Sequence, residues 1–245
     1  MPALESYDKK LGYSYCLGVY PCMLLLENRP KSALRLLLSD ISRGEGVDAL
    51  REKCSSLGVR EEIAPKALKR ISGKDNCYAA LAFEKFEGEL KGDRPHAVFH
   101  NISDSGNLGT SLRSAVGFGY EDVALIRPCA DVFEPHTLRS SMGAFFLLRL
   151  KTYDSIEDYL SAFPGRELYP FMLDGATDMD LVAPKAARAH TLIFGNEAAG
   201  LPAYFQKLGR SVKIDQSDRI DSLNLSVAAS VAMYTFSRYQ KKREG

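Results

Sequence analysis

The chain has 245 residues, of which 45% are hydrophobic and 26% charged, and its formal net charge is +1. A chain of this size can bury a core without disulfide or metal support, and its balanced charge neither indicates nor excludes a nucleic-acid partner, because a basic face can hide in a neutral total. The five cysteines are odd in number and form no Cys-x-x-Cys pair, so they predict neither a disulfide framework nor a zinc site, and we expect no metal.

The N-terminal part predicts a small α/β domain over residues 1–90. Helical patterns cover residues 17–26, 47–57 and 64–71, and strand-like patterns cover 33–38, 59–63 and 77–83. Residues 91–94 lie in a charged, glycine-bearing stretch that ends at Pro95, and we interpret them as a linker. We interpret the five cysteines as reduced thiols of a cytoplasmic protein. The polar N-terminus predicts no signal peptide, and no apolar run is long enough to span a bilayer, so we expect no membrane partner.

The C-terminal part, residues 95–245, begins with a predicted strand at 97–102 that runs into a polar turn and then a helix. Leu108 and Leu112 lie on the apolar stripe of that helix, and Arg113 lies off it. Ligands of open α/β sheets collect at such carboxyl-end turns. The alternative is that Asn107 is only a turn or cap residue and Arg113 a solvated charge.

The middle of this part predicts further alternation of strands and helices. Strands are expected at 123–126, 147–150 and 171–173, and helical segments at 135–142 and 155–163. His136 lies in the first helical segment, where a surface or capping role is favoured over a catalytic one.

A buried apolar strand at 191–194 ends abruptly at Gly195, where a glycine lets backbone approach a ligand closely. Glu197 follows as a carboxylate at the end of that strand, or alternatively as a cap of the next helix. After a last short strand at 212–214, the polar turn 221–224 opens into a helix rich in small residues. The side-chain oxygens of Ser222 and Asn224 suit a helix N-terminus.

Together these three stretches resemble the three motifs of the SpoU (TrmH-type) family of RNA ribose 2′-O-methyltransferases, part of the SPOUT class. The matching residues are 107–109 with 113–115, 194–197 with 200–201, and 222–229. Residues 141–146 are similar to the family's segment between the first two motifs, and the catalytic resemblance covers about 95–242. The N-terminal part is more loosely similar to the small α/β substrate-binding domain of many members, with Gly73 and Asn76 matching its closing pattern.

The resemblance implies an α/β SPOUT domain with a C-terminal trefoil knot, preceded by the small α/β RNA-binding domain. It implies S-adenosylmethionine as methyl donor, a homodimer with the active site near its interface, and an RNA substrate, with rRNA favoured over tRNA by family analogy.

The resemblance also implies roles for individual residues. Arg113 matches the arginine proposed to activate the ribose hydroxyl, and the residues placed around it are Asn107, Glu197, Ser222 and Asn224. The residues expected to line the cofactor are Phe194, Gly195, Asn196, Ile214 and Leu223. One departure is Asp215-Gln216, where members often have Pro-Met, so the loop on the adenine side differs.

The proton of the ribose hydroxyl needs an acceptor, and an arginine is a poor base because its pKa exceeds about 12. Arg113 is better suited to hold the neighbouring phosphate and stabilise the developing alkoxide, with Glu197 or the substrate phosphate accepting the proton. Basic side chains that suit RNA, or simply a solvated surface, are Lys66, Lys69, Arg70, Lys185, Arg188, Arg238, Lys241, Lys242 and Arg243.

Two other interpretations stay open. A non-catalytic RNA-binding relative of the same fold would fail to bind S-adenosylmethionine. An unrelated nucleotide-binding α/β enzyme would bind a dinucleotide instead, although the chain has no Gly-x-Gly-x-x-Gly or P-loop pattern.

Overall fold

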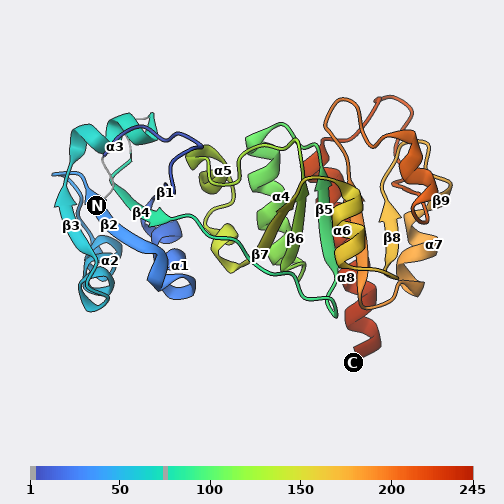
Figure 1. The fold of residues 1–245 in the computed structure, drawn as a ribbon, viewed down its shortest axis with the longest axis horizontal. Coiled ribbons are helices and arrows are strands. Elements are labelled where there is room, and N and C mark those ends of the chain that lie inside the picture. Colours follow the sequence, from blue (N-terminus) through green and yellow to red (C-terminus); the bar gives the residue numbers. More distant parts are fainter. Residues whose placement is uncertain (1–3, 74–76, 245) are drawn as a thin grey trace. The chain divides into compact units, whose positions relative to one another are not determined.

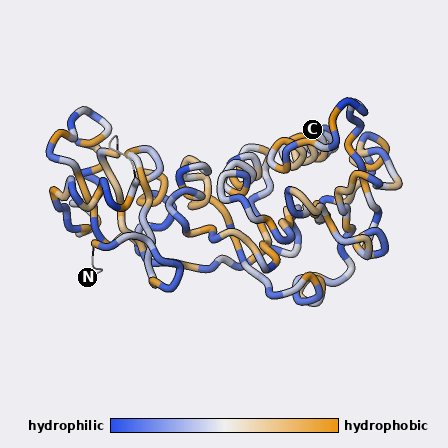
Figure 2. The backbone as a smooth tube through the Cα atoms, turned by 90° about the horizontal axis from the view of Figure 1, so that it is seen from above, coloured by the Kyte–Doolittle hydropathy of each residue, from blue (hydrophilic) through white to orange (hydrophobic). Residues whose placement is uncertain are grey.

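The computed structural model describes residues 4–73 and 77–244, with the side chains of 241, 243 and 244 left aside (Figure 1). Asn76, which the sequence comparison singled out, lies outside these residues. The chain forms two compact units, of which the first contains the residues up to Phe86 together with Asp131–Leu147. The second contains Glu87–Ala130 and the chain from Leu148 onward. Hydrophobic segments recur in both units, and each unit has its own core (Figure 2).

The first unit is built on a four-stranded sheet of order β1-β4-β2-β3, in which β4 is antiparallel to β1 and β2, and β2 is parallel to β3. Its strands are β1 (Tyr13–Leu17), β2 (Ala33–Leu38), β3 (Arg60–Ile63) and β4 (Ala79–Glu84). Its helices are α1 (Val19–Asn28), α2 (Glu45–Ser56), α3 (Pro65–Ser72) and α5 (Pro135–Ser140). The helix predicted from residue 17 begins at Val19, because Gly18 has a φ of 97° and separates it from β1.

Aromatic side chains attach segment 131–147 to this first unit. The ring of Phe146 meets Phe83 edge-on at 5.2 Å, and the ring of Phe145 stacks on Phe86 at 5.2 Å. Phe133 also lies within 6.4 Å of Phe83. Aromatic contacts of this kind contribute about 0.5–1.5 kcal/mol beyond the area that they bury.

The second unit is built on a five-stranded sheet of order β7-β6-β5-β10-β8, in which every pairing is parallel. Its strands are β5 (His96–His100), β6 (Asp122–Ile126), β7 (Arg149–Tyr153), β8 (Glu167–Pro170) and β10 (His190–Phe194), and a separate parallel pair is formed by β9 (Thr177–Asp178) and β11 (Val212–Lys213). Its helices are α4 (Ser105–Gly117), α6 (Ile156–Ala162), α7 (Met179–Val182) and α8 (Leu225–Glu244). The two units confirm the predicted α/β class, with a small N-terminal mixed sheet and a C-terminal parallel sheet.

One predicted strand was wrong in position. We expected a strand at 171–173, whereas β8 ends at Pro170 and Phe171 makes only an isolated bridge to Val212. Leu168 and Tyr169 are buried and pair with β10, while Leu173 is 70% exposed. Burial against the neighbouring strand, which a single sequence does not display, decided where the strand lies.

Helices α4 and α8 contact each other through small residues. The Ser230 hydroxyl donates to the Ser114 hydroxyl at 2.7 Å, and Ala229 and Ala232 of α8 are buried. The Asp104 side chain caps α4 by accepting from the backbone N–H of Asn107. This pairing brings the N-termini of the two helices to the same edge of the sheet.

A buried polar chain lies at the amino ends of the strands. Arg166 donates to Thr191 at 2.9 Å, the hydroxyls of Thr191 and Tyr159 are 2.8 Å apart, and Tyr159 reaches Nδ1 of His96 at 2.9 Å. Burial lowers the pKa of His96 to about 4, and burial likewise lowers the pKa of His190 to about 4. Both imidazoles are therefore neutral at pH 7.

No helix in the described part of the chain is both long enough and apolar enough to span a membrane.

Candidate functional site

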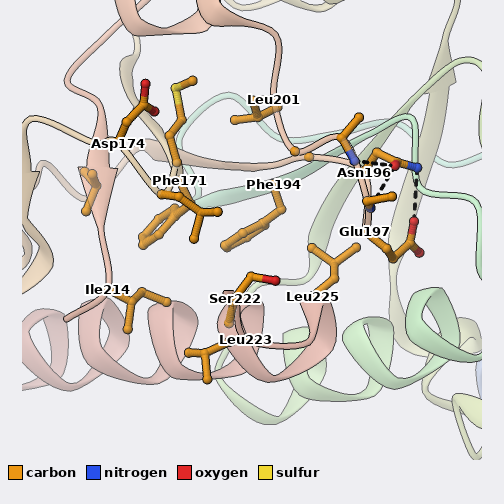
Figure 3. A pocket seen from close by; sticks show the side chains of 18 of the residues that line it. Phe171, Asp174, Phe194, Asn196, Glu197, Leu201, Ile214, Ser222, Leu223 and Leu225 are labelled. Atoms are coloured by element: carbon orange, nitrogen blue, oxygen red, sulfur yellow. Dashed lines mark hydrogen bonds between the residues drawn. The ribbon is translucent and has the colours of Figure 1, made fainter. Parts of the chain in front are cut away.

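A cavity of about 300 Å³ opens where strands β8 and β10 end and α8 begins (Figure 3). Three segments of the second unit form its wall. Its lining residues are 171–174, 194–201, Val212, Ile214, Gln216, Ser222, Leu223, Leu225 and Ala228. The cavity thus lies at the carboxyl edge of a parallel sheet, where α/β proteins commonly bind ligands.

Aromatic rings from β5, from β10 and from the segment that follows β8 support one wall of this cavity. Phe194 stacks on Phe171 with centroids 5.0 Å apart and on Phe99 with centroids 5.5 Å apart. Phe194 and Phe171 line the cavity, and Phe99 lies in register with Phe194 on the neighbouring strand. Phe194 and Phe171 make this wall apolar, which suits a ligand with an apolar or aromatic part.

Gly195 is required by the loop itself. A Cβ at this position would overlap the backbone carbonyl of Gly200, and Asn196 and Gly200 exchange backbone hydrogen bonds of 3.1 and 2.9 Å. The sequence predicted close approach of a ligand at Gly195. The structure shows that the loop's own backbone makes the close approach, while Gly195 still lines the cavity.

The Asn196 side chain holds the same loop. Its Oδ1 accepts from the backbone N–H groups of Ala198 and Ala199 at 2.9 and 3.0 Å, and its Nδ2 donates to the carbonyl of Asn101 at 2.9 Å. The side chain therefore stabilises the loop. Asn196 can contact a ligand through its backbone, and its side chain sets the shape of the loop.

Glu197 binds the turn that precedes α4, and not the helix that follows it in the chain. Its carboxylate accepts from the backbone N–H and hydroxyl of Ser103 at 3.1 and 2.9 Å and from the backbone N–H of Asp104 at 3.0 Å. Nδ2 of Asn196 donates to it as well, at 3.2 Å. Burial acts to raise the pKa of Glu197, but these hydrogen bonds outweigh it and hold the pKa below its usual range.

Asn107 and Asn224 extend this network into α8. Nδ2 of Asn107 lies 3.4 Å from the Glu197 carboxylate, and its Oδ1 accepts from Nδ2 of Asn224 at 3.0 Å. Oδ1 of Asn224 in turn accepts from the backbone N–H and hydroxyl of Ser226 at 2.9 and 2.7 Å. A continuous polar chain thus joins the three stretches singled out in the sequence.

Of the remaining predicted site residues, Ser222, Ile214 and Leu223 line the cavity. Arg113 does not line it. Arg113 lies exposed on α4, and its guanidinium makes no hydrogen bond or ion pair with the described residues. Its position suits contact with a molecule that lies outside the cavity.

Sequence reasoning missed the segment that follows β8, which contributes Phe171 and Asp174 to the cavity. The signal was present as an aspartate and a glycine after an apolar stretch, but the strand itself was misplaced. Gln216, in the loop that departs from the family pattern, also lines the cavity and donates to the carbonyl of Asp221. Within residues 4–73 and 77–244, no three His, Cys, Asp or Glu side chains are arranged to bind a metal ion.

Comparison with known proteins gives matches over both units. The model of the SpoU rRNA Methylase family matches residues 95–234. An uncharacterized tRNA/rRNA methyltransferase of Synechocystis is 32% identical over 187 residues, which are 74% of this chain and 67% of that protein. The 23S rRNA (guanosine(2553)-2′-O)-methyltransferase RlmP of Bacillus subtilis is 31% identical over 216 residues, 78% of this chain and 86% of that protein.

Among solved structures, the SpoU methyltransferase AviRb of Streptomyces viridochromogenes in complex with AdoMet has the same fold. It superimposes with a TM-score of 0.80 at 23% identity, covering 94% of this chain and 91% of that one.

Proposed function

The chain belongs to the SpoU rRNA Methylase family, and from this premise we propose that it is an S-adenosylmethionine-dependent RNA methyltransferase that methylates a ribose 2′-hydroxyl. It is an enzyme of the RNA 2′-O-methyltransferase class, EC 2.1.1. The observation that carries the proposal is the polar chain from Glu197 through Asn107 to Asn224, which joins all three family motifs beside one cavity.

The residues of the cavity fit S-adenosylmethionine. The apolar wall of Phe194, Ile214 and Leu223 suits the adenine, and loop backbone from Gly195 onward suits its polar edge. When bound, this cofactor supplies an activated methyl group on a sulfonium. Much of the catalysis then falls to alignment, because the donor needs no further activation.

We assign Arg113 to the substrate. Its exposed guanidinium is free to hold the phosphate beside the ribose and to stabilise the alkoxide that forms as the hydroxyl loses its proton. Glu197 is a poor proton acceptor, because its oxygens already accept several hydrogen bonds and its pKa is lowered. We therefore assign Glu197 to hold α4 and Asn107 in place, and we assign the proton to the substrate phosphate beside the ribose. Ser222, two residues before Asn224 in the chain, lines the cavity.

We propose rRNA rather than tRNA as the substrate, since the Bacillus subtilis relative acts on 23S rRNA. Exposed basic side chains occur on α3 of the first unit (Lys66, Lys69, Arg70). In the second unit they occur before β10 (Lys185, Arg188) and on α8 (Arg238, Lys242). The first unit would bind RNA as the family's substrate-binding domain does. Unpaired nucleotides, which expose the ribose, are the expected targets.

The homodimer is also part of the proposal, and the surface of α8 supports it. Val227, Val231 and Tyr234 follow helical spacing and are 47%, 36% and 49% exposed. Phe118, at the end of α4, extends this stripe by a ring contact with Tyr234 at 5.6 Å. An apolar helical stripe of this kind favours burial against a second copy.

Two further expectations from the family stand as proposals. The C-terminal trefoil knot is supported by the way in which segments 171–174, 194–201 and 212–228 all meet at one cavity. A cytoplasmic location is supported by the five free cysteines, since secreted proteins commonly pair theirs.

The test is a titration of the purified protein with S-adenosylmethionine by calorimetry, followed by methyl transfer from labelled cofactor to rRNA and tRNA. We expect one cofactor bound per chain and label on ribose 2′-oxygens of rRNA. Binding of RNA without binding of the cofactor would instead identify a non-catalytic relative.

A further inference from the structure

Asp174 occupies a rigid turn directly after β8. The backbone N–H of Gly175 donates to the carbonyl of Met172 at 3.1 Å, and the N–H of Met172 donates to the carbonyl of Val212 at 2.9 Å. A Cβ on Gly175 would lie 2.5 Å from the carbonyl carbon of Val212. The turn is thus pressed against β11, and the position of Asp174 is fixed by backbone contacts on both sides.

The Asp174 side chain lines the cavity at the end away from Glu197 (Figure 3). Nε2 of Gln206 donates to its Oδ2 at 2.7 Å. Within the described residues, this is the one hydrogen bond that the carboxylate makes, and Oδ1 has no partner. Glu197, the other carboxylate of the cavity, is fully engaged by Ser103, Asp104 and Asn196.

An ionised carboxylate with a free oxygen favours a ligand that presents neutral or cationic donors, because charge-assisted hydrogen bonds are about twice as strong as neutral ones. The methyl donor presents such donors at two places, the ammonium of its amino-acid end and the hydroxyls of its ribose. The ribose carries two hydroxyl donors and no charge. An acidic residue that follows a parallel strand commonly binds the ribose of a nucleotide in open α/β sheets.

We propose that Asp174 is a cofactor-binding residue whose free carboxylate oxygen accepts a hydrogen bond from the ribose hydroxyls of S-adenosylmethionine, with Gln206 holding the carboxylate in place. This proposal rests on the proposed function, because it presupposes the cofactor. It adds to the cavity a specificity-determining contact that none of the three sequence motifs contains.

The test compares ligands with and without the hydroxyls. S-adenosylhomocysteine and its 2′,3′-dideoxy analogue are titrated by calorimetry into the full-length wild-type chain and into Asp174→Ala. We expect Asp174→Ala to raise the Kd for S-adenosylhomocysteine roughly 10- to 100-fold, which is the range for loss of a hydrogen bond to a charged group. The dideoxy analogue should bind the wild type and the variant alike.

Two further variants control for folding. Asp180→Ala removes an exposed carboxylate on α7 that does not line the cavity, and it should leave both affinities unchanged. Gln206→Leu removes the hydrogen-bond partner of Asp174. It should raise the Kd for S-adenosylhomocysteine by a smaller factor than Asp174→Ala does. Circular dichroism melting checks that each variant is folded.

The outcomes separate the two proposals. Suppose that the wild type binds S-adenosylhomocysteine. If Asp174→Ala binds it equally well, or if the substitution raises the Kd of both ligands by the same factor, the assignment of Asp174 is overturned and the proposed function stands. If the wild type binds neither S-adenosylmethionine nor S-adenosylhomocysteine, the proposed function is overturned and the assignment falls with it.

Discussion

Asn107 and Asn224 are 117 positions apart in the chain, yet the side-chain amide of Asn224 donates to the side-chain carbonyl of Asn107 at 3.0 Å. The other end of each amide is also committed, with Asn107 directed at Glu197 and Asn224 at Ser226. Each asparagine therefore serves as donor and acceptor at once. Replacing either asparagine by a side chain that can only donate or only accept therefore breaks the hydrogen-bond network at a known bond.

Asn224→Asp isolates the bond between the two asparagines. The aspartate still accepts from Ser226 and still suits the N-terminus of α8, but it places an oxygen against the Asn107 carbonyl. We expect loss of about 0.5–1.5 kcal/mol of unfolding free energy and a roughly 100-fold fall in turnover from misalignment. Urea unfolding and methyl-transfer rates measure the two effects. Asn28→Asp, which removes an exposed amide contact to Leu24 in the first unit, is the control and should retain full activity.

Glu197→Gln distinguishes a positioning role from a base role. The amide would turn an NH₂ toward one of the donors of Ser103 or Asp104, so we expect a loss of about 1–3 kcal/mol of unfolding free energy together with lower turnover. If Glu197 only positions other groups, the residual activity of the variant should depend on pH as the wild-type activity does. Full stability combined with a changed pH dependence would show instead that Glu197 is the proton acceptor.

Arg113→Lys keeps the charge of the side chain but loses the fork that holds a phosphate in two places. We expect turnover to fall by roughly 100-fold, while the Kd for S-adenosylmethionine stays within about twofold because Arg113 does not line the cavity. Calorimetry and single-turnover methylation test the two parts. Near-normal turnover would remove Arg113 from the reaction.

Gly195→Ala tests the close packing of the loop. The added methyl would overlap the backbone of Gly200, so the loop must shift and the cavity wall with it. We expect a lower melting temperature and loss of S-adenosylmethionine binding by at least about tenfold. Gly117→Ala is the matched control, since a Cβ there meets no atom within 4 Å. Unchanged cofactor affinity in Gly195→Ala would show that the loop conformation is not needed for binding.

Acid should destabilise the second unit through its buried histidines. His96 and His190 have pKa values of about 4 in the folded chain, against about 6.5 when unfolded, so the unfolded state binds more protons between these values. The contribution of each neutral histidine to the free energy of unfolding is therefore fully present above pH 7. It is lost as the pH falls, by about 2 kcal/mol per histidine between pH 7 and pH 5. Urea unfolding at several pH values measures the slope. His96→Asn should flatten it, and an unchanged slope would exclude His96 as a cause.

The fold was predictable where apolar residues run without interruption. The strands expected at 97–102 and 191–194 appear as β5 and β10, because a central parallel strand is buried on both faces and shows it in the sequence. The strand β8 was not predictable in this way. It contains a glutamate and a proline, and its burial comes from β10, a neighbour about twenty residues later.

The candidate site was predictable in part as a set of residues, but not as a set of contacts, since Phe171, Asp174 and Gln216 were missed and Arg113 lies outside the cavity. The resemblance to the family's motifs placed Asn107, Glu197 and Asn224 together, yet a single sequence gives no information on which atom of each side chain faces which partner. Asp174 was missed for the same reason as β8, since its role depends on a turn that is pressed against Val212.

The discontinuous first unit has a consequence for how this chain can be divided. Cutting at Phe86 would leave Phe133, Phe145 and Phe146 attached to the wrong fragment, without the rings of Phe83 and Phe86 that cover them. A fragment that begins at Glu87 would carry these rings exposed and would be prone to aggregate. Exchange of the first unit between relatives therefore requires two simultaneous replacements, one of the chain up to Phe86 and one of Asp131–Leu147.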